Sequence, residues 1–300
     1  MKDSSMGHLA CFVAYVIFGV NIIVCKDLTG SHLISPIVLF FLRSIGAGLL
    51  FWLLGLFLPH EKVELRDLPK ICAASFLGFF LTQMTFLSAI SEITPMDCSI
   101  LSSLSPLYTM FIAAYALKEP ITVRKAGGVL MSFLGVTYLI VNTTNASGVV
   151  LETKPEGVFL MLLNTISFAL YLGFFKPLIA KYSLISFLKW IFLFSTILSL
   201  PFAFGELVTI DFMTLPPAIL SELAFLIVFS TCIAYFLIPY GQKRIRPTLV
   251  SMYSYVQPII AIVISIWVGM DTLSWQKVLA AVMVFGGVVM VNYSRSARSN

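Results

Sequence analysis

The side chains of this chain that could do chemistry are polar residues inside long apolar runs. The uncharged ones are amides and phenols: Asn21, Gln83, Tyr108, Asn164, Tyr171, Tyr235 and Gln257. In lipid such a group usually bonds to a neighbouring helix, for a gain of about 0.6–2 kcal/mol. For each residue alone, a structural bond and a place in a binding cavity are therefore equally good interpretations.

Two apolar runs contain an internal proline, Pro106 in one and Pro258 in the other. A proline inside a helix frees the carbonyl four residues earlier, here that of Ser102 or Ser254. Exposed backbone and hydroxyls at membrane depth are tolerated only against protein or water, so these faces should line a cavity. The prolines would then mark two gates. The alternative is a pair of structural kinks whose serines bond to their own backbone.

Arg43 is a charged residue about eight positions from the end of an apolar run, which corresponds to about 12 Å of helix. An arginine at the centre of a membrane helix costs about 2.5–3.5 kcal/mol. It therefore needs carbonyl or carboxylate partners, or a wet cavity. Two interpretations stay open: a bond to the backbone ends of neighbouring helices, or contact with a substrate.

Several kinds of chemistry lack the residues that they need. No Asp or Glu lies in the middle of an apolar run, so exchange of cationic drugs for protons is not expected. No His–carboxylate pair suits catalysis, and no glycine pattern suits ATP binding. The five cysteines form no CxxC pair, and the basic residues are scattered through short loops. We therefore expect no enzyme activity, no metal, no cofactor and no nucleic-acid partner.

The elements that position these residues are apolar segments of membrane length. Of the 300 residues, 59% are apolar and 11% are charged, whereas a soluble domain carries about 25% charged residues. A spanning helix needs about 20 mostly apolar residues. Ten segments qualify: residues 7–26, 34–58, 69–90, 96–117, 124–142, 157–177, 184–204, 217–240, 248–269 and 275–293. We predict an all-α integral membrane protein with ten transmembrane helices.

The chain contains one pattern twice, at an offset of about 152 residues. The matched pairs include Pro106 with Pro258, Glu119 with Asp271, Lys125 with Lys277, and Gly135 with Gly287. A match without gaps is an internal repeat. We assign residues 1–145 and 153–295 to two five-helix repeats. Because five crossings are an odd number, the second repeat starts on the opposite side of the membrane and the repeats are inverted.

Loop charge predicts the orientation, because cytoplasmic loops carry an excess of Lys and Arg. With the N-terminus inside, fourteen of the nineteen basic residues fall in inner segments. Only Lys26, Lys154 and Lys277 fall in outer segments, and Arg43 and Lys189 lie within spans. We therefore expect an integral protein of the plasma (inner) membrane with both termini in the cytoplasm.

Ten helices in two inverted halves resemble the drug/metabolite transporter superfamily, specifically its EamA branch. In that branch each half carries a helix with an internal proline, then an acid, then a glycine-bearing helix, here Pro106, Glu119, Gly128 and Gly135, and Pro258, Asp271 and Gly287. Arg43 stands in the second helix, where the branch tends to have an arginine. The resemblance implies a central cavity lined by the helices that carry Asn21, Gln83, Tyr108, Tyr171, Tyr235 and Gln257.

We predict a secondary transporter of small neutral or zwitterionic metabolites, with amino acids as candidates, working by alternating access. Export is implied by the resemblance alone. Glu119 and Asp271 end the proline-containing helices at matched positions, so we expect structural roles for both acids. The alternative function is a non-transporting membrane receptor or scaffold, although the short loops offer little partner surface. The expected partners are a small-molecule substrate and the lipid bilayer, and monomer and homodimer both stay open.

Overall fold

A computed structural model describes residues 2–58, 61–105, 107–108, 111–112, 123–143, 153–242, 244, 253 and 256–296. Pro106, Glu119 and Ser254, to which the sequence assigned roles, lie outside these described residues. Every regular element in the described part of the chain is a helix. The predicted all-α fold is therefore confirmed.

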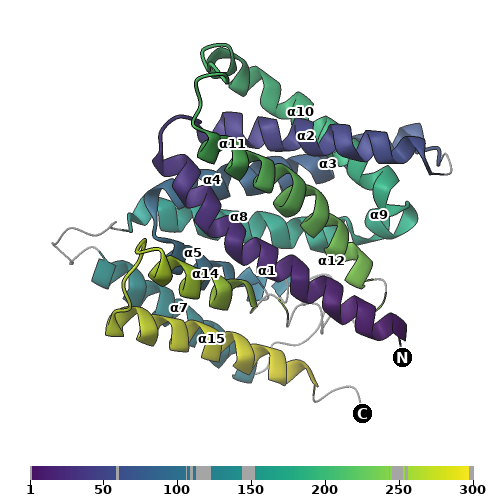
Figure 1. Ribbon diagram of the computed structural model, residues 1–300. Helices are drawn as coiled ribbons and strands as arrows, with labels where there is room; N and C mark the ends of the chain where they lie inside the picture. Colours follow the sequence, from purple (N-terminus) through teal and green to yellow (C-terminus); the bar gives the residue numbers. More distant parts are fainter. Residues whose placement is uncertain are drawn as a thin grey trace.

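The helices run back and forth through the molecule (Figure 1). The first half contains α1 (Lys2–Gly30), α2 (Pro36–Leu56), η1 (Leu65–Asp67), α3 (Leu68–Ser75), η2 (Phe76–Leu81), α4 (Thr82–Glu92), α5 (Pro95–Ser102) and α7 (Val123–Thr143). The second half contains α8 (Pro155–Phe174), α9 (Lys176–Lys181), α10 (Leu184–Leu207), α11 (Pro217–Phe225), η3 (Leu226–Ile233), α12 (Ala234–Gln242), α14 (Val256–Trp267) and α15 (Trp275–Ser296). Helices α3, η2 and α4 follow one another without a break, and so do α11, η3 and α12.

Capping residues and prolines explain where two of these helices begin. Ser35 precedes Pro36 at the start of α2, and its hydroxyl accepts a hydrogen bond from the N–H of Val38 at 3.5 Å. Thr94 precedes Pro95 at the start of α5 and likewise accepts from the N–H of Asp97 at 3.2 Å. A capping hydroxyl satisfies a free N–H group, and the fixed φ of proline suits the first turn.

Five helical segments are long and apolar enough to cross a membrane: Ser5–Gly30, Pro36–Leu56, Leu65–Glu92, Leu184–Leu207 and Pro217–Ile238. Four shorter apolar segments of 10–17 residues are Ala126–Tyr138, Pro155–Tyr171, Val256–Trp267 and Trp275–Gly287. Each of these segments overlaps a predicted span. The span predicted at residues 96–117 lies partly outside the described residues, so the count of ten helices stays a prediction.

The two halves run in opposite directions. The last turns of α1 and the start of α8 both contact the end of α4. Lys26 Nζ donates to the carbonyl of Ser91 at 3.1 Å, and Lys154 N donates to the carbonyl of Glu92 at 2.9 Å. Because α1 opens the first half and α8 opens the second, the repeats are inverted. We call this end of the molecule the Asp97 end; the N-terminus lies at the opposite end (Figure 1).

The halves interlock by exchanging equivalent helices. Helix α1 packs against α12 and α14, and its repeat counterpart α8 packs against α4 and α5. Two further pairs join the halves, α2 with α10 and α7 with α15. At the α7–α15 contact a Cβ on Gly287 would lie 2.4 Å from the carbonyl oxygen of Gly128, and one on Gly135 would lie 2.9 Å from Met283 Cβ. The repeated glycines therefore let these two helices approach closely.

A π-helical segment interrupts the same helix of each repeat. Directly after η2 the hydroxyl of Thr82 donates to the carbonyl of Leu77 at 2.8 Å, five residues earlier. In η3 the hydroxyl of Thr231 donates to the carbonyl of Leu226 at 2.7 Å, again five residues earlier. Such wide turns occur frequently at functional sites because they displace backbone groups from the regular ladder. The sequence analysis did not predict them.

Candidate functional site

The Arg43 cluster joins both halves of the molecule. Arg43 of α2 donates from Nε to Thr231 Oγ1 at 3.0 Å and from Nη1 to Gln83 Oε1 at 3.3 Å. Gln83 of α4 in turn donates from Nε2 to the hydroxyl of Tyr235 on α12 at 2.8 Å. Residues of the first and second repeats therefore hold one guanidinium group in place.

Helix α1 completes the Arg43 cluster on its other side. Arg43 Nη1 lies 3.8 Å from Cys25 Sγ, and Cys25 Sγ lies 3.7 Å from Asn21 Oδ1. Four residues that the sequence singled out, Asn21, Arg43, Gln83 and Tyr235, are thus brought together. Thr231 and Cys25 were not among the residues predicted from the sequence to line a site.

The charge of Arg43 is buried without a counter-ion. The residue is 3% exposed, and no carboxylate in the described part of the chain lies within 4.0 Å of its guanidinium. Among the described residues nothing accepts a hydrogen bond from Nη2. A buried charge is costly unless it is paired and fully hydrogen-bonded. The cluster therefore positions a guanidinium that still has donors to offer to an anion.

A small cavity adjoins the guanidinium. It is lined by Phe40, Arg43, Ser44, Phe79, Gln83, Phe192, Thr231 and Tyr235. Its volume of about 10 Å³ is close to the least that one water molecule needs. The Ser44 hydroxyl at this cavity is buried and has no hydrogen-bond partner among the described residues. The cavity thus combines an unsatisfied hydroxyl with a buried cation.

Aromatic rings form the apolar wall of this cavity. The ring centroid of Tyr235 lies 5.1 Å from that of Phe79 and 6.3 Å from that of Phe192, and Phe79 and Phe192 are 5.2 Å apart. Tyr171, another predicted cavity residue, packs against Phe79 at 5.8 Å. Its ring fills the space beside Gly78, where any Cβ would lie 2.4 Å from it. Tyr171 therefore supports the aromatic wall from behind.

Two other predicted cavity residues and one predicted gate residue lie on α5 and α14. The Ser102 hydroxyl donates to the carbonyl of Cys98 at 2.8 Å within α5, as the structural alternative for that serine expects. Gln257 is half-buried, and Pro258 is buried, near the start of α14. Tyr108 is also half-buried. No hydrogen bond among the described residues joins the side chains of Ser102, Tyr108 or Gln257 to the Arg43 cluster.

Asn164 of α8 bonds to the first residue of α4, directly after the π-helical segment of the first repeat. Its Nδ2 donates to the carbonyl of Thr82 at 2.6 Å. The hydroxyl of Thr82 is already engaged with the carbonyl of Leu77. In the second repeat the equivalent threonine, Thr231, bonds to Arg43. The threonine at each wide turn therefore accepts a hydrogen bond from a helix of the other repeat, through its carbonyl in Thr82 and through its hydroxyl in Thr231.

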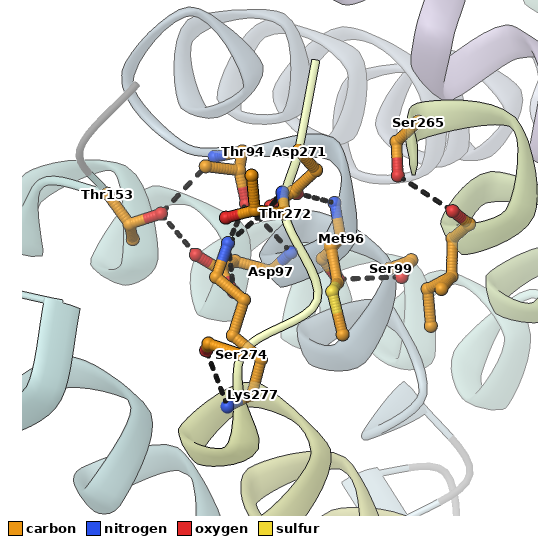
Figure 2. A network of polar contacts seen from close by, with 11 residues as sticks. Thr94, Met96, Asp97, Ser99, Thr153, Ser265, Asp271, Thr272, Ser274 and Lys277 are labelled. Carbon is orange, nitrogen blue, oxygen red and sulfur yellow. Dashed lines mark hydrogen bonds and ion pairs between the residues drawn. The ribbon is translucent and has the colours of Figure 1, made fainter. Parts of the chain in front are cut away.

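A second polar cluster joins the halves at the Asp97 end, and Figure 2 shows it from close by. Lys277 Nζ lies 2.6 Å from Asp271 Oδ1 and 3.7 Å from Asp97 Oδ1. The same ammonium group donates to Thr94 Oγ1 at 3.2 Å. Thr153 donates its hydroxyl to Asp97 Oδ2. We call these five residues the Asp97 cluster.

Asp271, which the sequence predicted to be structural, touches the proline-containing helix of the other repeat. Its Oδ2 accepts the N–H of Met96 in the first turn of α5 at 3.1 Å. A carboxylate at a helix N-terminus is favourable because free N–H groups and the helix dipole point towards it. Asp271 therefore anchors the connection between α14 and α15 to the start of α5.

A third cluster lies at the opposite end and ties the connection before α3 to the residues before α10. Lys181 Nζ lies 2.6 Å from Asp67 Oδ2 and 2.7 Å from Glu64 Oε1, and the hydroxyl of Tyr182 donates to Asp67 at 2.8 Å. Hydrogen bonds from Lys181 and Arg66 hold the pKa of Glu64 below its ordinary value. Hydrogen bonds to Asp67 and Glu64 raise the pKa of Lys181. None of these residues lines the cavity beside Arg43.

Comparison with known proteins agrees with this architecture. The sequence profile described as the EamA-like transporter family matches residues 5–141 and again residues 155–293. A crystal structure of a protein with 18% sequence identity superposes with a TM-score of 0.65 and covers 98% of this chain and 99% of that chain. This structural likeness supports the fold.

Relatives in three organisms carry transporter names. An uncharacterized transporter of Archaeoglobus fulgidus is 22% identical over 258 residues, 86% of this chain and 89% of its own length. The uncharacterized transporter YcxC of Bacillus subtilis is 26% identical over 77% of this chain and 73% of its own length. The uncharacterized inner membrane transporter YedA of Escherichia coli is 23% identical over 95% of this chain and 90% of its own length. With the family profile matching both halves, the chain belongs to the EamA-like transporter family.

Proposed function

We propose that this membrane transporter moves small neutral or zwitterionic metabolites, with amino acids as the leading candidates, by alternating access. The observation that carries the proposal is the Arg43 cluster, where α1, α2, α4, η3 and α12 of both repeats meet around a buried cation without a counter-ion. Central sites at the interface of inverted repeats are the usual substrate sites of secondary transporters.

The chemistry of Arg43 favours a carboxylate on the substrate. A guanidinium presents its N–H groups as a planar fork that matches a carboxylate with two parallel hydrogen bonds. The unsatisfied hydroxyl of Ser44 offers a further donor beside it. The rings of Phe79, Phe192 and Tyr235 offer an apolar wall for the rest of the substrate. An amino acid has both parts.

Substrate entry requires the helices to separate. The present cavity of about 10 Å³ has room for no more than a water molecule. Two features offer places to bend: the π-helical segments η2 and η3 and the proline Pro258 in α14. With inverted repeats, bending of equivalent helices opens the site first at one end and then at the other.

We further propose that the Asp97 end faces outwards and that transport runs from the cytoplasm to the outside. The orientation rests on the distribution of basic residues, since Lys26, Lys154 and Lys277 lie at the Asp97 end and the sequence predicts the other loop lysines and arginines at the opposite end. The outward direction rests on the family resemblance. The receptor or scaffold alternative receives no specific support from the described contacts.

Counterflow in proteoliposomes tests this proposal directly. Vesicles loaded with a mixture of unlabelled amino acids should accumulate a radiolabelled one, with and without a pH gradient. A preferred amino acid should compete, whereas its methyl ester, which lacks the carboxylate, should compete at least about tenfold less well, as expected for one charged hydrogen bond lost. Absence of counterflow with every amino acid in correctly folded protein would contradict the proposed substrate class.

A further inference from the structure

The Asp97 cluster contains two carboxylates and only one ammonium group. Asp97 is 0% exposed and Asp271 is 3% exposed. The side chain of Lys277 is 13% exposed. When all three are ionised, a net negative charge is buried at the Asp97 end.

The ammonium of Lys277 lies closer to Asp271 than to Asp97. Asp271 Oδ1 lies 2.6 Å from Nζ and also accepts the N–H of Thr272 at 3.0 Å. Its Oδ2 accepts the N–H of Met96 at 3.1 Å. Asp97 Oδ1 lies 3.7 Å from Nζ, is buried and accepts no hydrogen bond from the described residues, whereas Asp97 Oδ2 accepts the hydroxyl of Thr153. The unpaired charge therefore belongs to Asp97.

The internal repeat also distinguishes Asp271 from Asp97, because only Asp271 has an acidic counterpart in the other half. At the offset of 152 residues, Asp271 and Lys277 correspond to Glu119 and Lys125, an acid and a lysine again. At the same offset Asp97 corresponds to Leu249, an apolar residue. The Asp271–Lys277 pair thus belongs to the repeated framework, whereas Asp97 is an acid added at one end only.

The surrounding charges do not compensate Asp97. Lys26 of α1 donates to the carbonyl of Ser91. Lys154, before α8, pairs with Glu92 of α4 at 2.5 Å, and Glu156 lies in the first turn of α8. Lys277 and Asp271 complete the charged groups around Asp97. In the described part of the chain the ammonium of Lys277 is the only cationic group within 4.0 Å of the Asp97 carboxylate.

We propose that Asp97 binds a proton and that this proton stabilises the closed state of the Asp97 end. Burial of a carboxylate that has a hydrogen bond at Oδ2 but none from the described residues at Oδ1 favours the uncharged acid over the carboxylate. When this end closes, Asp97 takes one proton from the water on that side, and the bond that forms is Oδ1–H. When the end opens, water solvates the carboxylate, the O–H bond breaks and the proton returns to the same solution. The proton biases the cycle and does not cross the membrane.

This inference rests on the alternating access of the proposed function and adds its regulation. Acid on the Asp97 side holds that end closed, and alkali on that side opens it. If the Asp97 end faces outwards, external pH and not the internal pH sets how readily the outer side opens. Because one proton is involved, the ratio of closed to open molecules changes by at most about tenfold per pH unit.

Distances between two spin labels measure the opening without any substrate. We would place them at Glu156→Cys, at the start of α8, and Leu273→Cys, between α14 and α15, in full-length protein without its native cysteines; both positions are exposed. In nanodiscs between about pH 5 and pH 9, which brackets the ordinary range of a buried acid, the short-distance population should fall as pH rises. The Asp97→Asn variant keeps an oxygen for Thr153 but no charge, so it should stay closed at every pH.

Two further variants make the result decisive. Asp97→Leu, which carries the residue type of the repeat counterpart, should also be insensitive to pH. Asp211→Asn removes an exposed acid between α10 and α11 at the same end and should titrate like the parent protein. A parent protein without a pH response, or Asp97 variants that respond like the parent, would overturn the proposal. Protein that titrates as expected but moves no amino acid would contradict the transport proposal alone.

Discussion

Arg43 illustrates how the meaning of a single residue depends on partners far along the chain. Its Nε bonds to Thr231, 188 residues later, and its Nη1 bonds to Gln83, 40 residues later. Both partners are neutral, so the guanidinium keeps its full charge in a buried place. Stability alone gives no reason to retain such a charge, because neutral or apolar replacements of buried ions are often harmless.

The Arg43→Gln variant should therefore separate stability from function. We expect a thermal midpoint equal to or above that of the parent protein, because the desolvated charge is gone. We expect amino-acid counterflow to fall by about tenfold or more, the value of one charged hydrogen bond. Purified protein, melted in detergent and assayed in vesicles, gives both numbers.

Lys189→Gln supplies the matched control for Arg43. Lys189 is a buried cation of α10 whose Nζ lies 4.9 Å from the ring centroid of Trp52, away from the Arg43 cluster. Its removal should leave counterflow unchanged. If Arg43→Gln lowers the thermal midpoint by several degrees and spares counterflow, Arg43 is a structural residue and the substrate assignment is wrong.

The two acids of the Asp97 cluster should respond in opposite ways to neutralisation. Asp271→Asn leaves the ammonium of Lys277 without its partner at 2.6 Å and should cost about 1–3 kcal/mol of stability. Asp97→Asn removes an unpaired charge and should leave the thermal midpoint unchanged or raise it. Glu119, the repeat counterpart of Asp271, should behave like Asp271 when changed to Gln. Equal losses from Asp97→Asn and Asp271→Asn would mean that both acids are paired.

At the scale of elements, the two π-helical segments have similar geometry but make different contacts. At each segment the hydroxyl of a threonine, Thr82 directly after η2 and Thr231 within η3, bonds to the carbonyl five residues earlier. Only Thr231 also accepts a hydrogen bond from Arg43. The repeat therefore provides an internal comparison between a wide turn whose threonine bonds to Arg43 and one whose threonine does not.

Valine at these two positions tests that comparison, because it keeps the shape of threonine without the hydroxyl. Thr231→Val leaves both the Leu226 carbonyl and Arg43 Nε without a partner and should cost about 1–3 kcal/mol together with counterflow. Thr82→Val should affect stability less and spare counterflow. In the Arg43→Gln background the loss of counterflow from Thr231→Val should disappear, which a double-mutant cycle measures. An undiminished loss there would show that Thr231 acts independently of Arg43.

Most elements were predictable from the sequence because bilayer thickness fixes their length. The span expected at residues 184–204 is α10 (Leu184–Leu207), and that expected at 34–58 is α2 (Pro36–Leu56). The segments η2 and η3 were missed, since apolar side chains all round a helix leave no periodicity from which to infer a wide turn. The site was half predictable: Arg43 and Gln83 stand out as polar residues in apolar runs, whereas Thr231 and Cys25 look like ordinary residues of a membrane helix.

At the scale of the whole molecule, the inverted repeats give the two ends the same arrangement of helices, but the residues at the two ends differ. The Asp97 end carries a buried acid–lysine cluster between the halves. The opposite end carries the more exposed pairs of Glu64, Asp67 and Lys181. Orientation therefore decides which solution acts on Asp97.

A C-terminal reporter tests the orientation. Fused after Asn300, a reporter that is active only outside the cytoplasm should be silent, because the basic loops should lie on the same side as both termini. A reporter fused within the connection around residue 146, between the repeats, should be active. The opposite pattern would place the Asp97 cluster in the cytoplasm and reverse the side from which pH acts.

Alternating protection of two serines tests whether the whole molecule works as two gates. Ser102 is the last residue of α5, whose first turn carries Asp97, and Ser254 stands four residues before Pro258 in the sequence. Without native cysteines, Ser102→Cys should react with a membrane-impermeant thiol reagent from the Asp97 side only when that end is open. Ser254→Cys should react from the other side only when Ser102→Cys is protected, because a single closed site cannot face both solutions. Trapping the Asp97 end with Asp97→Asn should therefore protect the first cysteine and expose the second. Reactivities that stay constant in both variants would mean that Pro106 and Pro258 are fixed kinks, and the two-gate mechanism would have to be abandoned while the inverted fold stands.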